Sequence, residues 1–196
     1  IITLMRYYLD DNFKEEYNNL VKNTEKQLKI VLGIYGFGSL ILELIKQIMW
    51  SFNYNDGIVS WSYQWYAAPF QLCTTPLFVA IIAIFLKKES KIREALLSYT
   101  VFYTILSSLS VILIPDTCFT GQILINVHTM YLHCLAFVVS IYLIINKVVK
   151  IKPKNLLYAF NVFISFVAIA LLLDIVVYKT GLCHDETFNM FYISPY

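Results

Sequence analysis

Polar side chains inside long apolar stretches are the residues of this chain that could do chemistry. Cys73 lies within the stretch 62–86 and His133 within the stretch 121–146, so a thiol and an imidazole are both available to a nucleophilic reaction. An ionisable side chain in hydrocarbon costs about 3 kcal/mol unless it is satisfied, so such residues face a protein interior and indicate function. The other residues expected around a cavity are Gln71, Thr74, His128, Thr129, Glu43, Gln47 and Asp174.

The composition indicates that lipid is the solvent. Of the 196 residues, 59% are hydrophobic and only 14% are charged, which is too apolar for an ordinary soluble domain. The net charge of +2 gives no indication of a nucleic-acid partner. Little of the chain remains for a soluble domain, so any chemistry must come from residues on or between membrane helices.

Five stretches are long enough to span a bilayer, each close to the ~20 residues that a helix needs. They are 29–52, 62–86, 95–114, 121–146 and 155–178. We therefore predict an all-α, polytopic transmembrane helical bundle over residues 29–196. The polar residues 1–28 are expected to form a cytoplasmic or membrane-surface segment, and a sixth helix is expected beyond Tyr196.

The distribution of lysine and arginine predicts the orientation. The loops 87–93 and 147–154 each carry four basic residues, whereas the connections 53–60 and 115–122 carry none. The positive-inside rule therefore places the N-terminus and both basic loops in the cytoplasm. With that orientation, Cys73 and His133 both lie roughly a dozen residues from the outer ends of their helices, ~18 Å deep, so they could be level.

Plainer explanations compete with a catalytic one. An intramembrane cysteine is often a packing residue, a histidine can hydrogen-bond a neighbouring helix, and Glu43 with Lys46 can be a self-neutralising pair. Cys118 and Cys183 fall in predicted outer loops, where a disulfide is chemically permitted. The sequence shows no metal-ligand spacing and no phosphate-binding loop, so we predict neither a metal site nor a cofactor.

Three motifs resemble those of the YwaF-like, transmembrane-protein-164 family. They are Pro69-Phe-Gln-Leu-Cys73, His128-Thr-Met-Tyr-Leu-His133 and Phe191-Tyr-Ile-Ser-Pro-Tyr196, although Cys134 stands where members usually carry glycine after the histidine. The resemblance implies an integral membrane acyltransferase that acts on a lysophospholipid or related lipid, with a fatty acyl donor as its other partner. By a more distant similarity to androgen-induced membrane hydrolases, it implies Cys73 as nucleophile and His133 as general base.

Two further functions stay open. A small-molecule or proton-coupled transporter or binder would use Glu43, Lys46, His128, His133 and Asp174 along a polar pathway. Against it, no inverted repeat is apparent, and the half of the bundle nearer the basic loops is almost purely apolar. A structural or regulatory membrane protein would use the same polar residues for helix packing.

Overall fold

The computed structural model describes residues 11–55, 57–114, 119–183 and 188–195. Within these ranges the chain forms five α-helices, a short β-hairpin and two 3-10 turns. The elements are α2 (Asp11–Met49), β1 (Phe52–Asn55), β2 (Ile58–Trp61), η1 (Trp65–Ala67), α3 (Thr75–Phe85), α4 (Lys91–Leu113), α5 (Ile123–Ile145), α6 (Pro153–Thr180) and η3 (Met190–Tyr192). The prediction of an all-α polytopic bundle is confirmed.

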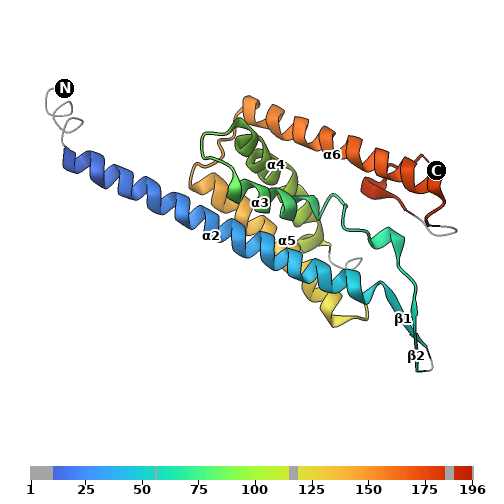
Figure 1. Cartoon of the computed structure of the whole chain (residues 1–196). Helices are drawn as coiled ribbons and strands as arrows, with labels where there is room; N and C mark the ends of the chain where they lie inside the picture. Colours follow the sequence, from blue (N-terminus) through green and yellow to red (C-terminus); the bar gives the residue numbers. More distant parts are fainter. Residues whose placement is uncertain (1–10, 56, 115–118, 184–187, 196) are drawn as a thin grey trace.

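Four of the described helices are long and apolar enough to cross a membrane, namely Asn23–Met49 of α2, α4, α5 and α6. Their exposed side chains are largely apolar, as lipid-facing surfaces require, and include Ile48, Leu106 and Leu172. α2 begins at Asp11, well before residue 29, and runs without interruption to Met49. Figure 1 shows it as the longest element, with the β1–β2 hairpin extending from its C-terminal end.

The second apolar stretch differs from the continuous helix expected over residues 62–86. Only Thr75–Phe85 is α-helical, and the preceding residues form the η1 turn and irregular backbone. Proline explains the difference, because Ala68 is held extended before Pro69 (φ −50°, ψ 143°) and Pro76 occupies the first turn of α3. Pro76 therefore helps to start a short helix.

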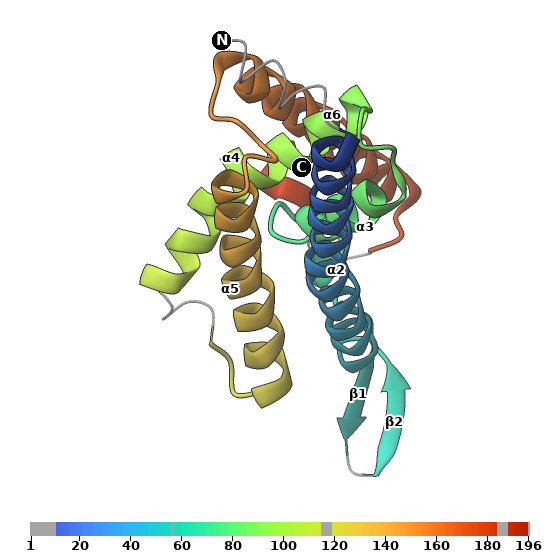
Figure 2. The same cartoon turned by 90° about the vertical axis from the view of Figure 1, so that its left-hand side faces the viewer.

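α4 lies at the centre of the bundle, where it packs against α3, α5 and α6, while α2 packs against α3 and α5. Figure 2 shows α2 and α5 side by side. Glycine allows α2 to approach both neighbours closely: a Cβ at Gly36 would lie 2.8 Å from Ile81 Cγ1 of α3, and one at Gly38 would clash with the Tyr131 side chain of α5. The main apolar core consequently forms between α2, α3, α4 and α5, and contains Leu32, Leu77, Val101, Leu132 and Ala136.

Candidate functional site

A buried carboxylate organises the polar residues of α2. The Glu43 side chain is 2% exposed, and its oxygens lie 2.7 Å from Lys46 Nζ and 2.9 Å from His128 Nε2 of α5. Gln47 Nε2 donates a further hydrogen bond of 2.7 Å to Glu43 Oε1. The four-residue spacing of Glu43 and Gln47 predicted a shared helix face, and the structure brings them into contact. Three positive or donor groups thus offset one buried negative charge.

Gln47 extends this network to the irregular segment that precedes α3. Its Nε2 also donates to the Ala67 carbonyl at 2.7 Å, and its Oε1 accepts a hydrogen bond of 2.7 Å from the Tyr63 hydroxyl. Partial burial and the nearby Glu43 carboxylate raise the pKa of Tyr63, so this hydroxyl stays protonated and remains a donor at neutral pH. Gln47 of α2, itself bonded to Glu43, therefore holds residues 63–67 in place.

Cys73 lies where the irregular segment becomes helical. It immediately precedes Thr74, the N-cap of α3, and its half-buried side chain packs against the main apolar core. Its thiol lies close enough to the hydroxyls of Tyr35 and Tyr99 to interact with them electrostatically. The partial positive charge at a helix N-terminus favours a negative group, so this position suits a thiolate. Irregular backbone at membrane depth is tolerated only inside protein or beside a cavity.

The two tyrosines beside Cys73 differ in their bonding. The Tyr99 hydroxyl shares a hydrogen bond of 2.7 Å with Thr75 Oγ1 on α3. The Tyr35 side chain is fully buried, yet its hydroxyl has no hydrogen-bond partner among the described residues. A buried hydroxyl without a partner loses the free energy of a hydrogen bond, about 1–3 kcal/mol. Tyr35 is thus a donor available to a group that enters the bundle.

His133 lies on α5, one and a half turns from His128, and is 7% exposed. It interacts electrostatically with His128. The residues on either side of this position, Leu132 and Ala136, belong to the same core cluster against which Cys73 packs. Cys73 and His133 therefore both adjoin the main apolar core, and their equal depth stays a prediction. Thr129, four residues before His133, is half-buried.

A profile of the TMEM164 family matches residues 2–195. The chain belongs to the TMEM164 family. The match covers all of the described residues and confirms the resemblance carried by the three motifs. No curated protein and no solved structure matches the chain.

In this TMEM164-family chain, two of the residues expected around a cavity hold the C-terminal segment. Asp174 Oδ1 on α6 accepts a hydrogen bond of 2.8 Å from the Met190 amide, and Gln71 Oε1 accepts one of 3.3 Å from the Phe191 amide. Met190 is fully buried against Ala170 and Ala68. The third motif is thereby packed between α6 and the segment that leads to Cys73. The motif that begins at Phe191 and the motif that ends at Cys73 are therefore neighbours in space.

Thr74 also has a structural task. Its Oγ1 accepts a hydrogen bond of 2.9 Å from the Gln71 amide and lies within donating distance of the Pro69 and Gln71 carbonyls. These contacts close the turn that precedes α3, and they occupy the hydroxyl. Thr74 therefore shapes the backbone next to Cys73, and its part in lining a cavity stays a prediction.

Sequence reasoning assigned no chemical role to a set of buried hydroxyls. Those of Tyr35 and Ser39 on α2, and of Thr104 and Ser108 on α4, have no hydrogen-bond partner among the described residues. The four-residue spacing of Tyr35, Ser39 and Glu43 was the available signal, because it places all three on one helix face. Within the described part of the chain, no group of three or more His, Cys, Asp or Glu side chains could hold a metal. Cys118 lies outside the described residues, so the structure leaves open whether it pairs with Cys183.

Proposed function

We propose that this chain is an integral membrane acyltransferase that carries the acyl group as a thioester on Cys73. The observation that carries the proposal is the position of the thiol at the N-terminus of α3, within electrostatic range of the Tyr35 hydroxyl, which has no hydrogen-bond partner among the described residues. Family membership supports a membrane protein of this kind but leaves its activity open. The substrates proposed are a fatty acyl donor and a lysophospholipid or related lipid.

The first half-reaction transfers the acyl group to the enzyme. His133 takes the thiol proton, and Cys73 Sγ attacks the carbonyl carbon of an acyl ester. The Tyr35 hydroxyl donates a hydrogen bond to the carbonyl oxygen as it becomes negative, the role of an oxyanion donor. The tetrahedral intermediate then collapses, the ester C–O bond breaks, and the imidazolium returns its proton to the departing alcohol.

The second half-reaction releases the acyl group to the acceptor. His133 takes the proton of the acceptor hydroxyl, whose oxygen attacks the thioester carbonyl. The C–S bond breaks as the new ester forms, and the thiolate recovers its proton from the imidazolium. Positioned proton transfer of this kind contributes about 10²–10⁴ in rate. The apolar core against which Cys73 packs, which contains Leu77 and Leu132, offers an acyl chain a suitable environment.

The buried carboxylate of Glu43 has a positioning role in this proposal. Glu43 holds His128 at 2.9 Å, and His128 is the electrostatic neighbour of His133. A fixed His128 limits the positions open to the second imidazole. We assign Glu43 and Gln47 to positioning, since they contact His128 and the segment 63–67 and not the reacting atoms.

The test is labelling of the full chain in membranes with a lipid-like, thiol-reactive acyl probe, with the modified peptide identified by mass spectrometry. We expect Cys73 to be labelled in the parent, Cys73→Ala to abolish that label, and His133→Ala to slow it at least about 100-fold. Cys134→Ala is the matched control, because Cys134 is another half-buried membrane cysteine and adjoins His133. Labelling that survives in Cys73→Ala at the parent rate would refute the thioester.

The buried charges of α2 and α5 favour a proton-coupled transporter or binder as the second candidate. Glu43, Lys46 and His128 form a desolvated ion-pair network of the kind found along proton pathways. That function requires solute flux without a covalent intermediate. Absence of any acyl label, together with reaction of Cys73 with a small thiol reagent, would favour it over the acyltransferase.

A further inference from the structure

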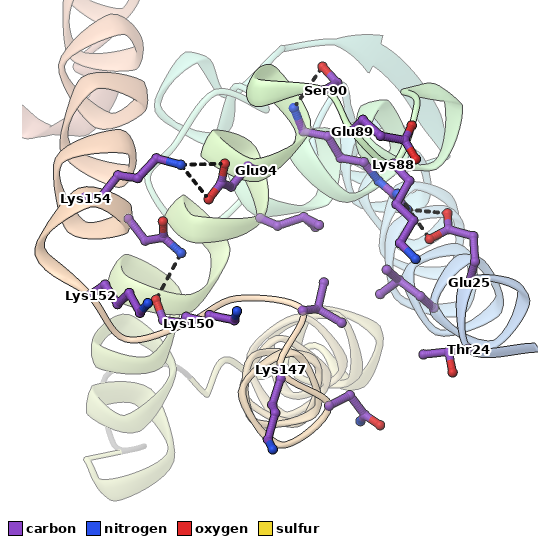
Figure 3. A pocket seen from close by; sticks show the side chains of 16 residues that line it. Thr24, Glu25, Lys88, Glu89, Ser90, Glu94, Lys147, Lys150, Lys152 and Lys154 are labelled. Carbon is purple, nitrogen blue, oxygen red and sulfur yellow. Dashed lines mark hydrogen bonds and ion pairs between the residues drawn. The ribbon is translucent and has the colours of Figure 1, made fainter. Parts of the chain in front are cut away.

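A cavity of about 590 Å³ opens at the basic end of the molecule, far along the helices from the Glu43 network. It lies between the beginnings of α4 and α6, the end of α5 and the first part of α2 that the membrane would cover. Figure 3 shows its labelled side chains surrounding the opening from all of these elements. The volume falls within the ~300–1,000 Å³ typical of small-ligand pockets.

The lining is positively charged. Six basic and three acidic side chains border the cavity: Lys88, Arg93, Lys147, Lys150, Lys152 and Lys154 against Glu25, Glu89 and Glu94. Two of the acids are already engaged. Glu25 binds Arg93 through two bonds of 2.7 and 3.2 Å, and Glu94 lies 3.2 Å from Lys154 Nζ. The other four lysines form no ion pair with any described residue, so the cavity has an excess of positive charge.

Arg93 provides a fixed cation at this site. Its side chain is 3% exposed, and its Nε has no hydrogen-bond partner among the described residues. Its backbone is held as well, because its amide donates to Ser90, the N-cap of α4. A buried guanidinium with a free donor is suited to a phosphate oxygen, which accepts several such bonds in fixed geometry. A mobile surface lysine offers charge alone.

We propose that this cavity binds the phosphate group of an anionic membrane phospholipid. Exposed apolar residues stand directly beside the basic ones: Ile92 (64% exposed) precedes Arg93, and Ile151 (68% exposed) separates Lys150 from Lys152. Such alternation is expected where hydrocarbon meets head groups, since the apolar side chains enter lipid while lysines extend to the interface. The cavity thus lies at the depth of a phosphate, and a lipid source is favoured over a soluble one.

The experiment compares two double variants that lose equal charge at the same end of the molecule. Lys150→Gln with Lys152→Gln removes two cavity lysines, while Lys87→Gln with Lys91→Gln removes two exposed lysines that do not line it. Asn155 Nδ2 donates a hydrogen bond to the backbone carbonyl of Lys150, so substitution of the Lys150 side chain leaves that bond in place. Each purified full-length protein in neutral lipid nanodiscs is titrated with phosphatidylglycerol, and bound lipid is counted by native mass spectrometry.

We expect the cavity variant to bind phosphatidylglycerol at least about tenfold more weakly than the parent, and the control variant to bind within about twofold of it. Equal weakening in both would show only a diffuse surface charge and would overturn the site. A second arm adds glycerol phosphate to protein in neutral lipid. Binding of this soluble phosphate at affinity equal to that of the lipid would overturn the lipid assignment. Because binding is measured without acyl transfer, it can succeed or fail independently of the Cys73 mechanism.

Discussion

At the scale of single residues, the buried charge of Glu43 decides how α2 and α5 meet. The carboxylate is shared by Lys46 and His128, whose side chains are themselves only 13% and 7% exposed. Removal of one partner leaves the others buried and uncompensated, which costs about 3–5 kcal/mol. We expect Glu43→Gln to lower the free energy of unfolding by about that amount, as measured by denaturant titration in detergent.

The matched control for this prediction is the exposed pair. Glu94 and Lys154 are 35% and 60% exposed, so Glu94→Gln should change stability by no more than about 1 kcal/mol. Equal, small effects in both variants would mean that water reaches Glu43, and the network would then contribute little to helix packing.

Tyr35 is the residue whose proposed role is most easily separated from folding. Tyr35→Phe removes only an oxygen that has no partner among the described residues, so stability should be retained or slightly raised. If the hydroxyl stabilises the oxyanion, the single-turnover acyl-transfer rate should fall about 10²–10³-fold. Tyr142→Phe is the control, because that buried hydroxyl also lacks a described partner and lies toward the basic end. An unchanged rate in Tyr35→Phe would restrict this residue to packing.

At the scale of elements, the short helix α3 depends on a segment that other elements hold. Residues 63–74 are fastened by Gln47 of α2, while Gln71 in turn holds the C-terminal segment that Asp174 of α6 also binds. Two residues of that segment, Phe191 and Tyr192, have positive φ values of 57° and 58°. Such backbone persists only where surrounding contacts impose it.

Asp174→Ala should therefore release the C-terminal segment. Loss of the bond to the Met190 amide removes a charge-assisted interaction of about 1.5–3 kcal/mol, so hydrogen exchange at that amide should quicken at least about tenfold. Asn161→Ala changes an exposed side chain of the same helix and should leave exchange unaltered. Unchanged exchange in Asp174→Ala would show that apolar packing of Met190 holds the segment by itself.

At the scale of the whole molecule, charge separates the two ends. The basic loops 87–93 and 147–154 lie together around the cavity, whereas the Glu43 network and the β-hairpin lie toward the other end. The positive-inside rule predicts that the basic end faces the cytoplasm. A membrane-impermeant maleimide applied to intact cells should label Ser60→Cys in the β1–β2 hairpin and spare Lys88→Cys until the cells are permeabilised. The reverse pattern, read by peptide mass spectrometry, would invert the predicted topology.

The sequence alone determined the class of structure and most of the long helices. The stretches 95–114, 121–146 and 155–178 became α4, α5 and α6 with ends within a few residues of those expected, because lipid requires long apolar helices whose backbone is internally bonded. The contact of Glu43 with Gln47 was predictable for a similar reason, since a four-residue spacing is local geometry.

Only the tertiary structure decided where residues distant in the chain meet. Hydropathy averaged over 62–86 did not reveal that the helix starts at Thr75. The two prolines and the Thr74 turn act on the backbone locally, which an average hides. The hydrogen bond from Gln47 comes from another helix, so no local pattern contains it. Likewise, Met190 as the partner of Asp174, and Tyr35 beside Cys73, follow from which helices pack together. Sequence spacing fixes the face of a helix, but the neighbour that covers that face depends on packing of the whole bundle.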